Sequence, residues 1–133
     1  MRVFKDFNEI KSAVGSEVGV SDWVTVTQDR INRFAEATGD EQWIHVDVKR
    51  AKQELPAQTT IAHGLLTVSL VPEFVRSVMG LQGIKNTLNY GANRIRYLAP
   101  VPVARGCVAE FPSRQQMMCP PTASGSPMTS RSK

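Results

Sequence analysis

The sequence predicts an α+β fold in which a curved antiparallel sheet wraps around one long, buried helix. Residues 61–79 are apolar on nearly every helical face, which is typical of a helix surrounded by protein. Segments with the composition of strands lie on both sides of this helix in the sequence, at 22–26 and 85–98. The chain has 133 residues and 41% apolar residues, so we expect one domain with one core.

The N-terminal part of the chain is predicted to end in a turn that carries an aspartate. Residues 1–20 read as an amphipathic lead-in, and the strand at 22–26 follows. Thr27 can then cap a helix, and Gly39 can end it in the left-handed conformation that glycine adopts easily. Asp40 is therefore expected to lie in the turn directly after this helix.

The central helix is preceded by a segment that we predict to be a bridging loop with one short helix at about 47–54. Thr59 or Thr60 can cap the long helix, and Gly80 can stop it. Pro72 lies inside this helix and has no N–H to donate to the preceding turn. We therefore expect a kink at Pro72, or a separation of the last turns.

In the C-terminal third of the chain, the spacing of apolar residues that is typical of helices and strands gradually disappears. The strand-like segment at 85–98 leads into a proline-bounded connection at 99–103. Residues 112–133 consist mainly of Ser, Pro, Thr, Met, Gln and Arg without any periodicity, which is typical of disorder. The predicted organisation is therefore an incomplete α+β domain at 1–111 and a disordered tail at 112–133.

Composition narrows the classes of function. The formal charge of +4 and the pI near 9.4 suit an anionic ligand. The sequence has no basic stripe with interleaved aromatics and no zinc-finger or helix-turn-helix spacing, so we expect no nucleic-acid partner. The first residues carry charges where a signal peptide needs an apolar run, and charged residues interrupt the most apolar segment. We expect a cytoplasmic protein without a membrane partner.

The two cysteines give no sign of a metal site. Cys107 and Cys119 fit no metal-ligand spacing. In a reducing compartment such cysteines remain free thiols. The two cysteines could form a disulfide, but we favour free thiols, and we expect no metal.

The residues with the clearest chemistry lie between 37 and 66. Asp40 and His45 are five residues apart, and both side chain types exchange protons in enzymes that work near neutral pH. Gly64 stands at the head of the apolar helix, where backbone N–H groups lack intrahelical partners and can stabilise a developing oxyanion. Together these groups could move a proton beside a carbonyl.

Each of these residues also has a purely structural interpretation. Asp40 after a glycine can be an ordinary turn aspartate, and His45 between two β-branched residues can be a half-buried structural histidine. His63, next to the proposed donor, can order the start of the helix rather than transfer a proton.

Three stretches in the same order resemble the MaoC-like dehydratases, the R-specific enoyl-CoA hydratase group of the hot-dog fold, including its nodulation protein N-like branch. The resemblance spans roughly residues 4–103. The three stretches are Thr38-Gly39-Asp40 with His45, then Ile61-Ala62-His63-Gly64-Leu65-Leu66, then Asn89-Tyr90-Gly91 through Arg96-Tyr97-Leu98-Ala99-Pro100-Val101-Pro102.

This resemblance implies reversible hydration of trans-2-enoyl-CoA to R-3-hydroxyacyl-CoA, with coenzyme A as the substrate's carrier and no cofactor. By matching positions, Asp40 and His45 would be the acid–base pair, and the Gly64 amide would donate to the thioester oxygen. His63 and Leu65 would then contact the substrate. The resemblance also implies a homodimer with the thioester near the subunit interface.

One departure from the family pattern affects the expected function. A complete hot-dog domain continues past its Pro-Val-Pro connection with two more strands, whereas this sequence offers only 107–111 before the tail. We hypothesise that the C-terminus is truncated or frameshifted. Two alternatives to the hydratase stay open: an inactive chain or non-catalytic partner subunit, and an acyl-CoA thioesterase.

Overall fold

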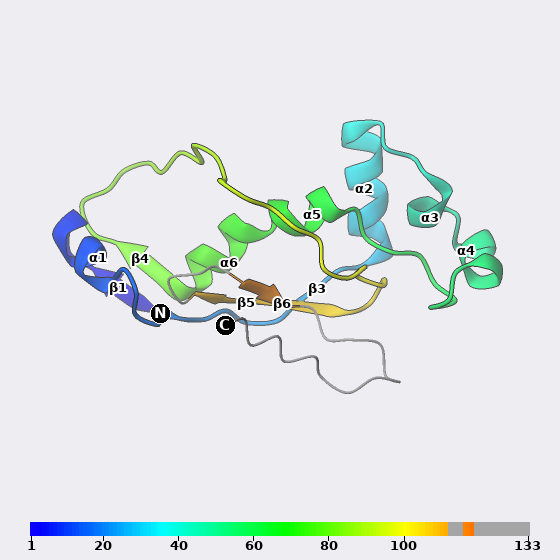
Figure 1. The fold of residues 1–133 in the computed structure, drawn as a ribbon. Coiled ribbons are helices and arrows are strands. Elements are labelled where there is room, and N and C mark those ends of the chain that lie inside the picture. Colours follow the sequence, from blue (N-terminus) through cyan, green and yellow to red (C-terminus); the bar gives the residue numbers. More distant parts are fainter. Residues whose placement is uncertain (112–115, 119–133) are drawn as a thin grey trace.

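The computed structural model describes residues 1–111 and 116–118, which form a mixed α+β fold (Figure 1). This confirms the predicted class. The strands are β1 (Arg2–Phe4), β2 (Gly19–Val20), β3 (Val24–Thr25), β4 (Met79–Leu81), β5 (Gly106–Phe111) and β6 (Gln116–Met118). The helices are α1 (Phe7–Ala13), α2 (Gln28–Thr38), α3 (Trp43–Val46), α4 (Val48–Glu54), α5 (Gly64–Ser69) and α6 (Val71–Val78).

The strands form two separate sheets. β2 and β3 pair antiparallel with successive parts of β5, and β6 pairs antiparallel with β5 as well. β1 and β4 form a second, parallel pair. The prediction of a wholly antiparallel sheet is therefore wrong for this pair. Parallel strands need a long crossover between them, and here that crossover contains all six helices.

Helix α2 begins and ends at the predicted residues. The Thr27 hydroxyl accepts the backbone N–H of Arg30 at 3.2 Å, which satisfies one unpaired donor of the first turn. Gly39 has φ 74° and its N–H donates to the Ala35 carbonyl at 2.8 Å, which closes the last turn. The chain therefore leaves α2 directly into the turn that carries Asp40.

The central apolar segment forms two consecutive helices rather than one. α5 ends at Ser69, and Pro72 lies in the first turn of α6, where its missing N–H costs nothing. This confirms the predicted break. The predicted start at Thr59 or Thr60 is wrong, because the Thr60 carbonyl accepts the Val103 N–H at 2.9 Å and the Ala62 N–H donates to Val101. These bonds hold the chain extended up to His63.

The end of this segment also differs from the prediction. Gly80 does not terminate a helix but lies within β4, opposite Val3 of β1. The second helix ends instead at Val78, where the chain turns extended to pair with β1. The loop before the central helix likewise contains α3 in addition to the expected helix α4.

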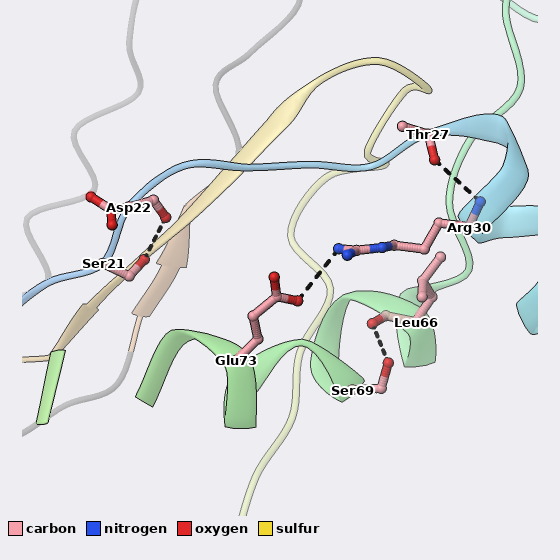
Figure 2. A network of polar contacts seen from close by, with 7 residues as sticks. All are labelled: Ser21, Asp22, Thr27, Arg30, Leu66, Ser69 and Glu73. Atoms are coloured by element: carbon pink, nitrogen blue, oxygen red, sulfur yellow. Dashed lines mark hydrogen bonds and ion pairs between the residues drawn. The ribbon is translucent and has the colours of Figure 1, made fainter. Parts of the chain in front are cut away.

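The core lies between α2, the α5–α6 pair and β5. Phe74 is 1% exposed, and the buried residues packed with it come from all of these elements. At its edge the Arg30 guanidinium of α2 reaches Glu73 of α6 at 3.5 Å (Figure 2). The remaining buried members of this core are Val26, Ile31, Ala62, Leu66, Leu70, Val78, Val101 and Cys107.

Residues 83–100 do not form the predicted strand. This segment runs extended past α6 and α5 (Figure 1), but it makes no backbone hydrogen bonds with the rest of the described chain. A strand needs a neighbour to complete its ladder, and none of the described strands lies in register with it. Leu88, Tyr90 and Leu98 are therefore largely exposed.

Two predictions for the C-terminal part need correction. Gln116–Met118, expected to be disordered, forms β6 because β5 offers it a pairing edge; the other residues of 112–133 lie outside the described residues. Cys107, expected to be a free thiol, is disulfide-bonded. Cys119 lies outside the described residues.

Among the described residues, no helix combines the length and the apolar character that crossing a membrane requires.

Candidate active site

A cavity of about 400 Å³ opens beside the start of α5. Three parts of the chain that are distant in sequence form its walls: the segment from the end of α2 to α3, the entry and first turn of α5, and the end of the extended segment. All five predicted site residues lie in these walls. The lining residues are Asp40, His45, Ile61, Ala62, His63, Gly64, Leu65, Thr67, Tyr97, Leu98, Ala99, Pro100 and Val101.

Asp40 occupies the turn after α2. Its backbone N–H donates to the Thr38 hydroxyl at 3.4 Å, and its carbonyl oxygen accepts a hydrogen bond from His63 Nε2 at 2.8 Å. Both hydrogen bonds use backbone atoms of Asp40. Its carboxylate makes no hydrogen bond within the described chain. The turn is fixed while the carboxylate stays available to a ligand.

His45 lies on the four-residue helix α3 and is 7% exposed. Its Nδ1 lies 2.7 Å from the carbonyl oxygen of Ile61. A carbonyl oxygen can only accept, so Nδ1 carries the proton, and in the neutral ring Nε2 keeps a free lone pair. The ring is therefore held in the tautomer whose second nitrogen can accept a proton from water.

His63 is the residue just before α5 and is 2% exposed. Its ring stacks on His45 with centroids 3.8 Å apart, and it also packs against Phe34 at 5.0 Å. Since its Nε2 donates to the Asp40 carbonyl, Nδ1 is the unprotonated nitrogen of the neutral ring, and it is buried without a partner in the described chain. His63 thus joins the Asp40 turn to the start of α5.

Gly64 is the first residue of α5, where the backbone N–H has no intrahelical partner. A Cβ on Gly64 would lie 2.8–2.9 Å from ring atoms of Tyr97, so a side chain here would force that half-exposed ring to move. Leu65 follows at the cavity rim and is 63% exposed. The glycine therefore lets an aromatic ring approach the proposed donor closely.

The side chains of Asp40, His45 and His63 form a compact cluster. One ligating atom from each lies within 4.8 Å of those of the other two. Two of these residues are buried, and Asp40 lies at the more open side. One carboxylate and two imidazoles thus lie at a mostly apolar cavity, with the start of a helix beside them.

Comparison with known proteins shows which family this chain belongs to. Residues 9–112 match the family model described as a MaoC like domain. The chain belongs to the MaoC-like domain family. The resemblance inferred from the three motifs is therefore confirmed.

Relatives of this MaoC-like chain include a dehydratase and a nodulation protein. It is 50% identical over 103 residues to 3-hydroxyacyl-thioester dehydratase Z of Mycobacterium tuberculosis (strain ATCC 25618 / H37Rv), a match covering 77% of this chain and 68% of that protein. It is 42% identical over 102 residues to nodulation protein N of Rhizobium meliloti (strain 1021), covering 71% of this chain and 59% of that protein.

Two solved structures share the fold of this MaoC-like chain. The monoamine oxidase regulatory protein from Archaeoglobus fulgius superposes with a TM-score of 0.65 at 27% identity, covering 82% of this chain and 70% of that chain. R-hydratase PhaJ1 from Pseudomonas aeruginosa superposes with a TM-score of 0.58 at 17% identity, covering 87% and 91%. At 17% identity the second match shows only that the fold is shared.

One residue that supports the site of this MaoC-like chain could not be predicted from the sequence. The Gln28 side chain donates to the His45 carbonyl at 2.8 Å, and its Oε1 accepts the hydroxyl hydrogen of Thr60, which is fully buried. Gln28 thus connects α2 to both α3 and the chain entering α5. These contacts span 17 and 32 residues, so no local pattern could have revealed them.

Proposed function

We propose that this chain catalyses the reversible hydration of trans-2-enoyl-CoA to R-3-hydroxyacyl-CoA. The observation that carries the proposal is the meeting of the Asp40 and His45 side chains in one cavity whose wall includes Gly64. The 50% identity to a 3-hydroxyacyl-thioester dehydratase supports the same reaction class.

The acid–base pair supplies the proton transfers. In the hydration direction, the oxygen of water attacks C3 of the enoyl group, and the pair of Asp40 and His45 takes up one proton from that water. The same pair delivers one proton to C2, so its total protonation is unchanged after each turnover. In the neutral form of His45, Nε2 is the unprotonated nitrogen, because Nδ1 donates to the Ile61 carbonyl. Such positioned acid–base groups typically contribute about a hundred- to ten-thousand-fold to the rate.

The backbone N–H of Gly64 stabilises the charge that this addition creates. Attack at C3 moves negative charge onto the thioester oxygen, and a fixed amide donor at that oxygen is typically worth about 3–4 kcal/mol of barrier. Tyr97 covers Gly64 closely. We therefore assign the thioester carbonyl to the space between the Gly64 amide and the Asp40–His45 pair.

The rest of the cavity suits an acyl chain. Its wall is largely apolar, with Ile61 and Val101 on the inner side and the more exposed Leu65 and Leu98 at the rim. His63 fits this proposal as a residue that orders the site beside the substrate. The proposal includes a homodimer, and the net charge of +4 suits the anionic coenzyme A carrier.

The experiment is hydration of crotonyl-CoA, followed by the loss of enoyl absorbance. We expect Asp40→Asn and His45→Gln each to lower kcat by about a hundred-fold or more. Asp29→Asn is the matched control, because Asp29 is an exposed aspartate that pairs only with Arg33 on the surface of α2. Unchanged activity in either site variant would refute the assignment.

The same assay separates the other candidate functions. Release of free thiol from acyl-CoA without loss of enoyl absorbance would identify a thioesterase. A folded parent chain with neither activity would identify a non-catalytic subunit, and light scattering on that sample would give its oligomeric state.

A further inference from the structure

We propose that Asp40, His45 and His63 together bind one divalent transition-metal ion, best Zn²⁺, at the mouth of the cavity. One potential ligand atom of each residue lies within 4.8 Å of those of the other two, and the described part of the chain contains no other such group of three. Two imidazoles and a carboxylate are a donor set that zinc accepts readily, whereas calcium and magnesium prefer oxygen ligands alone.

Both imidazoles already make the hydrogen bond that a ligating histidine usually makes through its other ring nitrogen. A ligating histidine almost always donates its other ring N–H to a carbonyl or carboxylate, which fixes the tautomer and raises the basicity of the ligating nitrogen. Here His45 donates through Nδ1 to the Ile61 carbonyl at 2.7 Å, and His63 donates through Nε2 to the Asp40 carbonyl at 2.8 Å. His45 Nε2 and His63 Nδ1 are consequently the nitrogens with free lone pairs.

A second observation points independently to a ligand. His63 Nδ1 is buried in a residue that is only 2% exposed, and it has no hydrogen-bond partner in the described chain. Buried acceptors without a partner are rare, because desolvation without a replacement bond costs free energy. A metal ion bound at this nitrogen would satisfy it.

Binding requires the three side chains to move closer together and to reorient. In a tetrahedral site with bonds of about 2.0–2.1 Å, the ligand atoms lie roughly 3.3 Å apart, which is closer than the 4.8 Å limit here. The rings of His45 and His63 are stacked, and the lone pair of an imidazole nitrogen lies in its ring plane, so one ring must also tilt out of the stack to point its lone pair at the ion. Asp40 is only partly buried, so a change in its side chain rotamer can bring the third ligand in.

The consequence for activity rests on the proposed hydration reaction. A zinc ion bound here occupies the lone pair of His45 and the carboxylate of Asp40, which are the groups that exchange protons with water and substrate. Zinc therefore inhibits by binding in place of the catalytic water, and a chelator reverses the inhibition.

Calorimetric titration of the full chain with ZnCl₂ near neutral pH, without reductant, tests the site independently of activity. We expect one ion per chain, with Asp40→Asn and His63→Gln weakening binding by at least the roughly 10- to 100-fold that loss of a metal ligand's hydrogen-bond partner typically costs. Asp29→Asn, the exposed control on α2, should bind as the parent does. Cobalt substituted for zinc should give the intense visible bands of a tetrahedral complex.

No other histidine can bind zinc in this test, because His45 and His63 are the only histidines in the chain. Asp40→Asn changes a partly exposed side chain, so it carries the test even if His63→Gln does not fold. Equal zinc affinity in the parent and Asp40→Asn would overturn the proposal, as would the absence of binding in a parent chain that melts cooperatively. Zinc binding by a chain without hydratase activity would support the metal site and refute only the proposed reaction.

Discussion

The imidazole rings of His45 and His63 stack with centroids 3.8 Å apart and planes 28° apart. A different backbone carbonyl holds each ring, that of Ile61 for His45 and that of Asp40 for His63. These contacts join the Asp40 turn, α3 and the entry to α5 into one unit. A change at His63 should therefore affect both members of the proposed acid–base pair.

His63→Phe should lower kcat about tenfold with little change in KM. Phenylalanine keeps an aromatic ring against His45 but cannot donate to the Asp40 carbonyl, so the turn loses a hydrogen bond worth about 1 kcal/mol. Steady-state kinetics on crotonyl-CoA give both constants. Phe34→Leu, which alters only the other ring contact of His63, is the control. A rise in KM with unchanged kcat would show instead that His63 contacts the substrate.

Gly64→Ala should lower kcat/KM about a hundred-fold, because the new Cβ would lie 2.8–2.9 Å from the Tyr97 ring and displace either the ring or the amide. Tyr97→Ala in the same chain removes that ring and should restore part of the loss. The four kcat/KM values of this double-mutant cycle measure the coupling between the two positions. Strictly additive losses would mean that Tyr97 does not constrain Gly64.

Gln28→Met should destabilise the chain by about 1–3 kcal/mol, because it leaves the buried Thr60 hydroxyl without its acceptor. Since the same side chain holds the His45 carbonyl, kcat should fall as well. Thermal melts and kinetics measure the two effects. Asn32→Ala removes only the exposed end of this network and should leave both nearly unchanged. A drop in stability with full kcat would show that Gln28 does not position His45.

Local chemistry explains which elements could be predicted from the sequence. Thr27, Gly39 and Pro72 act through their own backbone and its nearest neighbours, and the helix limits that they set are found in the structure. The start of α5 could not be predicted in this way. It depends on bonds from residues 60–62 to the chain near residue 102, which no neighbouring residue encodes.

The same distinction applies to the site. The motifs marked Asp40, His45, His63 and Gly64, and the fold brings all four to one cavity, although their roles stay predictions. Gln28 was missed because a glutamine at the start of a helix has no distinguishing local pattern. The unpaired state of residues 83–100 was missed too, since strand composition does not say whether a partner strand exists.

Phe74→Ala should destabilise the chain by about 3–5 kcal/mol, because this ring is 1% exposed at the centre of the core and its loss leaves a cavity. Phe7→Ala is the matched control: that ring is 65% exposed, and we expect a change within about 0.5 kcal/mol. Chemical denaturation of both variants gives the free energies of unfolding. Equal effects would show that α6 is not packed as described.

The extended segment at 83–100 also determines where a protease should cut first. Lys85, Arg94 and Arg96 are exposed and lie in backbone that makes no hydrogen bonds with the rest of the described chain, so trypsin can bind it without prior unfolding. Cleavage there would separate the Asp40–His45 wall of the cavity from the wall formed by residues 97–101. A substrate that spans both walls should protect these bonds, so tryptic digestion offers a simple assay for ligands of the cavity.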